Sequence, residues 1–168
     1  MAKNSEVDEV TEKTLRSGGV LAVLYFDIHG KNKEELQPLM VDLINNRLLK
    51  TRGVVYCHGS VESPIALGDG YSTAATVEIL FKDIKALVEV SFNFAPVGIN
   101  ILKPENEYVI KMPMMQSLML DLAQISIEYS NYILSRVLNE DEYKRIQENM
   151  KSREEIGKQI LGKKEGSS

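Results

Sequence analysis

Two histidines, His29 and His58, have the greatest capacity for chemistry in this sequence, because a neutral imidazole can act as a general base or bind a metal. Asp27 lies two residues before His29, so the two side chains share a face if the segment is a strand. A carboxylate beside an imidazole orients the ring for either role. Gly30 and Asn32 follow where a loop begins, and loops of this kind often carry binding residues. The simpler interpretation is a polar strand end with a glycine turn.

Cys57 and His58 are adjacent, as a thiol and its base could be, but successive residues of a strand point to opposite faces. No catalytic dyad is expected, and Cys57 is interpreted as a small core residue. We expect His29 and His58 on strands with a third strand between them, so that the two strand backbones lie ~9 to 10 Å apart at about 4.8 Å per strand. In addition, His29 ends its strand, whereas His58 lies in the middle of its own. One zinc ion needs both ring nitrogens about 2 Å away. Neither a metal nor a cofactor is therefore predicted within one chain.

Two glycine-containing segments could suggest phosphate binding or a nucleophile. Gly68-Asp69-Gly70 lacks the spacing of a phosphate-binding loop, and its carboxylate would repel a phosphate, so a hairpin turn is expected. Ser72 stands where a nucleophile elbow would place its serine, but Ala74 replaces the second glycine and a strand follows instead of a helix. No catalytic residue is predicted.

The periodicity of apolar residues predicts the elements that position these side chains. Strands are expected at 20–28, 54–62, 75–81 and 98–102, with Val55, Cys57 and Val61 on the inner face of the second. Asn32 and Glu35 resemble a capping box, which predicts a helix up to Leu48 that begins near Gln37 or is kinked at Pro38.

Residues 83–95 fit two patterns. Ile84, Leu87 and Val88 have helical spacing, whereas Val88, Val90 and Phe92 alternate as a strand would. Asp83 can cap a helix and Pro96 can end one, which favours the helix.

These elements predict an α+β fold with a ferredoxin-like βαββαβ antiparallel sheet, a long additional C-terminal helix at 114–138 and a charged terminal helix. The element order resembles that of ACT-type regulatory domains, which implies small-molecule sensing. We expect a polar N-terminal arm at 1–17 with only a helical turn or two, and a single domain at 18–138. A charged helical extension at 139–162 and a disordered tail at 163–168 complete the expected organisation.

Composition excludes several classes of protein. With 24 acidic and 20 basic residues, a nucleic-acid-binding surface is not expected. One cysteine cannot form an internal disulfide, and the charged N-terminus is no secretion signal, so a cytoplasmic location is expected. No apolar run reaches the ~20 residues of a membrane span, and no membrane partner is predicted.

The leading hypothesis is a non-enzymatic adaptor or ligand-responsive module that self-associates as a homodimer, through its sheet face or its C-terminal helices. The expected interface residues are Tyr25, Tyr56, Met115, Met119, Tyr129, Tyr143, Ile146 and Met150. A small-molecule ligand of such a module would contact Asp27, His29, Gly30, Asn32, Tyr56, His58 and Glu62. An alternative is a small enzyme or metal-dependent binder with a site at a subunit interface, formed by Asp27, His29, His58 and Glu62.

Overall fold

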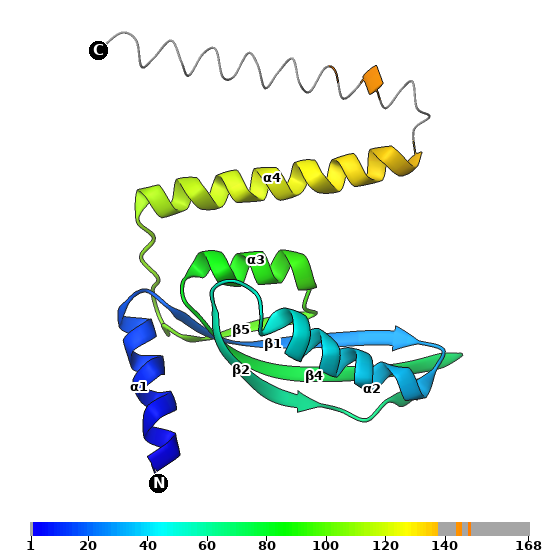
Figure 1. Ribbon diagram of the computed structural model, residues 1–168, viewed down its shortest axis with the longest axis horizontal. Helices are drawn as coiled ribbons and strands as arrows, with labels where there is room; N and C mark the ends of the chain where they lie inside the picture. The colour runs from blue at the N-terminus through cyan, green and yellow to red at the C-terminus, as the bar shows by residue number, and fades with distance from the viewer. Residues whose placement is uncertain (1, 138–143, 146–147, 149–168) are drawn as a thin grey trace. The chain divides into compact units, whose positions relative to one another are not determined.

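The computed structural model describes residues 2–137, 144–145 and 148 of the chain. The chain divides into two compact units, Met1–Ile110 and Lys111–Ser168. The first unit contains an antiparallel sheet with helices, and the second contains the long helix α4 (Met112–Val137) (Figure 1). The predicted α+β class and the long C-terminal helix are confirmed.

The sheet has five strands, and every pair of neighbours is antiparallel. They are β1 (Val20–Gly30), β2 (Val54–Val61), β3 (Ile65–Leu67), β4 (Gly70–Phe81) and β5 (Gly98–Lys103). The order is β2-β4-β1-β5, and the short β3 also pairs with β4. β1 and β4 therefore form the centre of the sheet, and β4 lies between the strands that carry the two histidines.

Four helical segments complete the first unit: α1 (Ala2–Arg16), α2 (Lys33–Asp42), the π-helical turn η1 (Leu43–Leu48) and α3 (Ile84–Phe94). α2 begins where the Asn32 side chain accepts a hydrogen bond from Glu34 N at 3.1 Å. The helix runs through Pro38, which cannot donate to the carbonyl one turn earlier. α2 thus starts earlier than the Gln37 alternative.

The ambiguous segment at 83–95 is helical, as predicted. Asp83 caps α3 by accepting a hydrogen bond from Ala86 N at 2.9 Å. Ala95 ends the helix in the left-handed conformation, with φ of 46°. The apolar residues fit a helix and a strand equally well, and the capping residue Asp83 correctly favoured the helix.

The core lies between one face of the sheet and the helices α2, η1 and α3. It consists of Val20, Ala22, Leu24 and Phe26 of β1, Ala75, Val77, Ile79 and Phe81 of β4, Met40, Leu48, Ala86, Leu87 and Val90. Because strand side chains alternate, the polar residues between these positions lie on the opposite face. We call that opposite side the outer face.

Three sequence predictions were wrong in detail. β3 was missed, because its three residues are too short to show alternation. The pairing of β2 with β4 shifts between Val54 and Tyr56, so Val54 packs against the core and Val55 is exposed. The N-terminal segment forms the 15-residue helix α1 instead of a turn or two.

The expected helical extension at 139–162 and tail at 163–168 lie outside the described residues, apart from 144–145 and 148. Within the described part of the chain, the helices are all too short or too polar to cross a membrane.

Candidate functional site

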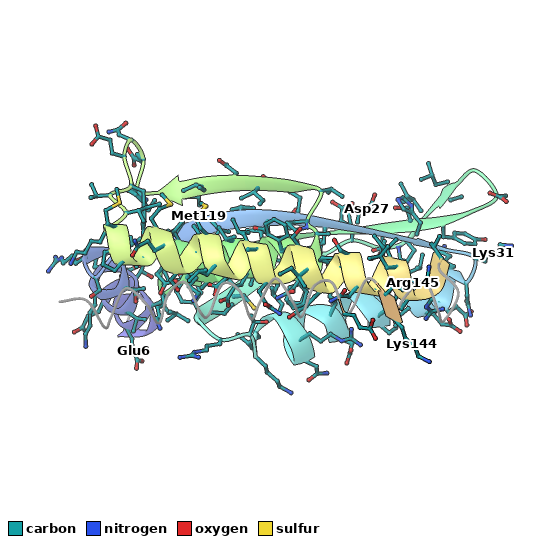
Figure 2. All side chains as sticks on the ribbon, turned by 90° about the horizontal axis from the view of Figure 1, so that it is seen from above. Glu6, Asp27, Lys31, Met119, Lys144 and Arg145 are labelled. Carbon is teal, nitrogen blue, oxygen red and sulfur yellow. The ribbon has the colours of Figure 1, made fainter. Side chains whose placement is uncertain are left out.

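Asp27 joins two polar side chains at one end of the outer face. One carboxylate oxygen, Oδ1, accepts a hydrogen bond from Ser72 Oγ at 2.6 Å. The other, Oδ2, lies 3.2 Å from His29 Nε2. Figure 2 shows the side chains around this end of β1, where Asp27 and Lys31 are labelled. Asp27 and His29 thus lie on the same face of the strand, as predicted, and their side chains are in direct contact.

The order of these three groups is serine, carboxylate, imidazole. Nucleophilic catalysis of the serine-triad kind needs the imidazole in the middle, where it can take the hydroxyl proton. Here the Ser72 hydroxyl donates to Asp27, and His29 lies on the far side of the carboxylate. The arrangement holds Asp27 and His29 in place, but it does not activate Ser72.

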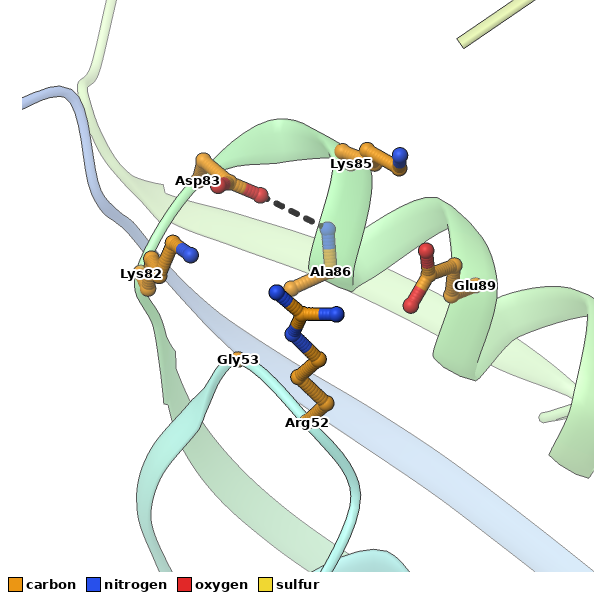
Figure 3. A pocket seen from close by; sticks show the side chains of 7 residues that line it. All are labelled: Arg52, Gly53, Lys82, Asp83, Lys85, Ala86 and Glu89. Carbon is orange, nitrogen blue, oxygen red and sulfur yellow. Dashed lines mark hydrogen bonds between the residues drawn. The ribbon is translucent and has the colours of Figure 1, made fainter. Parts of the chain in front are cut away.

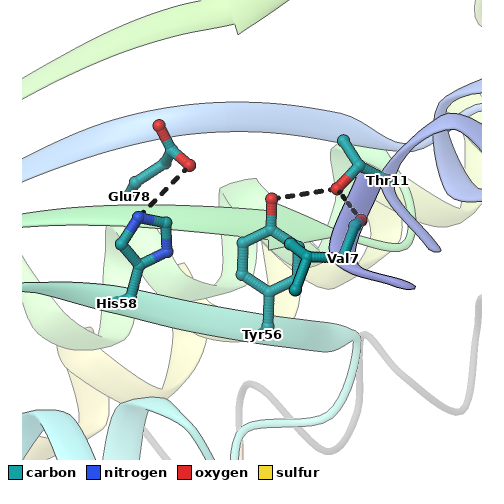
Figure 4. Close-up of polar contacts among 5 residues, drawn as sticks. All are labelled: Val7, Thr11, Tyr56, His58 and Glu78. Atoms are coloured by element: carbon teal, nitrogen blue, oxygen red, sulfur yellow. Dashed lines mark hydrogen bonds and ion pairs between the residues drawn. The ribbon is translucent and has the colours of Figure 1, made fainter. Parts of the chain in front are cut away.

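A second imidazole and carboxylate meet between β2 and β4. His58 Nε2 lies 3.6 Å from Glu78 Oε1, and the two residues are paired in register (Figure 4). The Tyr56 ring is adjacent, with its centroid 5.9 Å from that of His58. The Tyr56 hydroxyl lies 3.1 Å from Thr11 Oγ1, which links the outer face to α1.

The two imidazole–carboxylate pairs are far apart. His29 is opposite Ser72 and His58 is opposite Glu78, so the two pairs are six positions apart along β4. At ~3.3 Å per residue this distance is roughly 20 Å along the strand. In agreement with it, no group of three or more His, Cys, Asp or Glu side chains within the described residues could hold one metal ion.

The other predicted ligand residues have structural contacts. Gly30 is the last residue of β1, and Asn32 caps α2 while donating to the Glu35 carboxylate at 2.7 Å. Glu62 follows β2, and its backbone pairs with Ala74 O and Thr73 Oγ1, leaving its side chain exposed. The structure therefore places the predicted residues in two separate groups, and Glu62 belongs to neither.

Cys57 faces away from His58, as the alternation of strand residues requires. It is half-buried and packs against the core. Burial raises the pKa of its thiol, so at neutral pH the sulfur is protonated.

A cavity of about 130 Å³ at the start of α3 was not singled out from the sequence, because its residues come from separate segments (Figure 3). Three basic side chains, Arg52, Lys82 and Lys85, surround it together with Asp83 and Glu89. The amide of Ala86 already bonds Asp83, and Ile84 N donates to the Tyr108 hydroxyl at 3.3 Å. These two hydrogen bonds satisfy backbone N–H groups at the start of α3.

The expected interface residues fall on both units. Tyr25 and Tyr56 belong to β1 and β2 of the first unit, and Met115, Met119 and Tyr129 belong to α4 of the second. The remaining three, Tyr143, Ile146 and Met150, lie outside the described residues.

Two partners in these contacts were missing from the predicted site. Ser72 was considered only as a nucleophile, and Glu78 was not among the predicted site residues. Both contacts depend on the strand register, since Ser72 is diagonal to Asp27 and Glu78 is opposite His58. Strand alternation predicts which face of the sheet a side chain lies on. The residues that it contacts on the neighbouring strand can be predicted only when the register of the two strands is known.

The fold and the site thus define an antiparallel α+β protein with two separate imidazole–carboxylate pairs on the outer face of its sheet. A family model matches residues 21–160, and the chain belongs to the MJ0538 family. Comparisons with curated proteins and with solved structures gave no match.

Proposed function

We propose that this chain is a non-enzymatic protein that self-associates as a dimer and acts as an adaptor or ligand-responsive module. The observation that carries the proposal is the apolar edge of the sheet at β5. The side chains of Ile99 and Ile101 are 46% and 47% exposed. Both belong to β5, which lies at one end of the sheet order and therefore has one edge without a neighbouring strand among the described residues. An edge strand has unpaired backbone groups and can pair with another strand.

A two-fold dimer would satisfy this edge. Two copies of β5 running antiparallel would extend the sheet across the axis, and Ile99 and Ile101 of each copy would be covered by the same residues of the other. The spread of apolar side chains around α4 supports further contacts, because a helix with such wide coverage is usually buried on more than one side.

Sedimentation at micromolar concentration tests the dimer. The wild-type chain should sediment as a dimer, and a variant with Ile99→Lys and Ile101→Lys should be monomeric, since lysine on an edge strand opposes pairing. The matched control is Ile65→Lys with Leu67→Lys, which alters two exposed residues of β3 and should leave the dimer intact. A monomeric wild type, or a dimer that survives the β5 changes, would refute the proposal.

We also infer that the fold is ferredoxin-like. The support is the arrangement of two strand-helix-strand units, β1-α2-β2 and β4-α3-β5, whose strands interlock in one sheet while β3 remains a short addition beside β4. The element order also resembles that of ACT-type domains, which favours the ligand-responsive form of the proposal.

A cavity beside His29 favours small-molecule sensing as a second candidate function. It has a volume of about 270 Å³, with apolar walls from Leu36, Leu39 and Leu43 and polar groups from Asp42 and Arg47. A small molecule with an apolar side chain, one carboxylate and one ammonium group would complement this lining, because Arg47 can pair with the carboxylate and Asp42 with the ammonium.

Thermal unfolding in the presence of leucine tests this candidate. A ligand bound only to the folded state stabilises it by about 2.7 kcal/mol at about one hundred times its dissociation constant. Arg47→Gln should abolish the shift, while Arg52→Gln, which lies outside this cavity, should preserve it. Equal shifts in both variants would contradict the assignment.

A further inference from the structure

We propose that a second cavity, between α2–η1 and β2, binds an uncharged, elongated small molecule that is apolar in the middle and has a polar group at each end. We call this space the α2–β2 cavity. Its volume is about 480 Å³, which lies within the range of small-molecule sites. The inference goes beyond self-association, because the cavity is formed within one chain and away from β5.

Gly59 explains why β2 leaves space on this side. Cys57, Gly59 and Val61 alternate toward the core side of the strand, and Gly59 is paired with Val77 of β4. A Cβ atom at position 59 would lie 2.1 Å from Thr76 O, so no larger residue fits. With no side chain at this point, the inner surface of β2 is bare backbone above Val77. The backbone of β4 requires a glycine here by its close approach, and the missing side chain also leaves this part of the cavity wall as bare backbone.

The opposite wall is formed by the helix at the point where it changes its pitch. Ile44 lies on η1, where Leu49 N donates to Ile44 O at 2.9 Å in the five-residue spacing of a π-helix. Such turns are rare and are frequently found at functional sites. Val41 and Ile44 of this wall, together with Val61 across the cavity, supply apolar contact surface.

The lining determines the charge of the ligand. Among the described residues that line the cavity, none is Lys, Arg, Asp or Glu. His58 also belongs to the lining, but its ring lies 3.6 Å from the Glu78 carboxylate, which is the partner for any charge on the imidazole. Cys57 also faces it as a protonated thiol, since burial raises its pKa. A charged molecule would give up part of its hydration against Val41, Ile44 and Val61 without gaining a counter-charge from this lining. The ligand is therefore neutral.

Two carboxamides determine its length and its ends. Gln37 and Asn45 both line the cavity and are eight residues apart, which corresponds to about 12 Å of helix at about 1.5 Å per residue. Neither side chain has a hydrogen-bond partner among the described residues, and a carboxamide can both donate and accept. A ligand that lies along the helix can reach one carboxamide with each end.

Cys57 provides a direct measure of occupancy, because it is the only cysteine in the chain and lines the cavity. The probe is 1,8-octanediol, a neutral chain with a hydroxyl at each end, and the matched charged probe is octanedioate. The rate at which a small thiosulfonate reagent modifies Cys57 is measured against probe concentration. The diol should slow modification by about fivefold or more with saturation, and octanedioate should not. No protection by the diol, or equal protection by both, would overturn the proposal.

Variants of the two carboxamides complete the test. One lost hydrogen bond of about 1.4 kcal/mol corresponds to a tenfold weaker affinity. Asn45→Leu and Gln37→Leu should therefore each raise the diol concentration for half-protection about tenfold. The control is Asn46→Leu, because the neighbouring Asn46 carboxamide already bonds Asp42 and Lys50. Equal effects at 45 and 46 would exclude the assigned ends. Sedimentation of each variant tests the dimer separately, since neither residue lies on β5.

Discussion

Ser72 is directly opposite His29 in the β1–β4 pair, yet its hydroxyl donates to Asp27, which lies diagonally across the two strands. Ser72 is 8% exposed, so its hydroxyl has little access to water. A hydrogen bond from a buried hydroxyl to a carboxylate is stronger than one between neutral groups. This contact fixes the Asp27 carboxylate beside His29.

Ser72→Ala should lower the free energy of unfolding by about 1.5 kcal/mol, because hydrogen bonds to charged groups contribute about 1.5 to 3 kcal/mol. Urea denaturation at neutral pH measures the change. The same experiment on Asp27→Asn and on the double variant gives the coupling between the two side chains, which should be about 1 kcal/mol.

Ser60→Ala is the control for the Ser72 change. Ser60 is exposed on β2, and its hydroxyl bonds to none of the residues that the structure describes. Its replacement should change stability by less than about 0.5 kcal/mol. If both serine variants lose the same stability, the Asp27 contact is not the cause.

The fold was largely predictable because its signals are local, whereas the contacts of the site are not. Asp83 predicted α3 by capping it, and alternation placed Asp27 and His29 on one face. The bulge that turns Val55 outward, and the diagonal contact of Ser72, depend on how β4 aligns with its neighbours. A single residue of register shift exchanges the two faces of a strand, and no local pattern in β2 specifies that shift.

Gly59→Ala should destabilise the protein by about 3 kcal/mol or more, because the added carbon would overlap backbone atoms of β4 that cannot move without breaking the sheet. Gly68→Ala is the matched comparison. Gly68 has φ of 60°, and a Cβ atom added there would meet nothing within 4 Å, so the variant should lose only the cost of the left-handed backbone, about 1 kcal/mol. Thermal unfolding of both variants measures the difference, and equal losses would argue against close strand packing at Gly59.

Ala95→Gly should stabilise the protein by about 0.5 to 1 kcal/mol, because Ala95 ends α3 with φ of 46° and ψ of 57°, a conformation in which glycine avoids the steric cost of a Cβ atom. Asn93→Gly, within the regular helix, should give no such gain, because glycine is a poorer helix former there. Chemical denaturation of the two variants measures this contrast. A loss of stability at position 95 would show that the left-handed ending is not the source of strain.

Cys57 should make the protein less stable as the pH rises above the ordinary thiol value. Burial raises the pKa of the folded thiol, whereas the unfolded thiol ionises at about pH 8.5. Above that pH the folded state holds more protons than the unfolded state, so the stability contributed by the protonated thiol is complete below about pH 8.5 and is lost progressively up to the folded pKa.

Cys57→Ala removes this dependence, while the other titrating groups are common to both proteins. The difference in unfolding free energy between wild type and variant should therefore fall as the pH rises above about 8.5. A difference that stays constant above that pH would mean that the thiol ionises equally in both states.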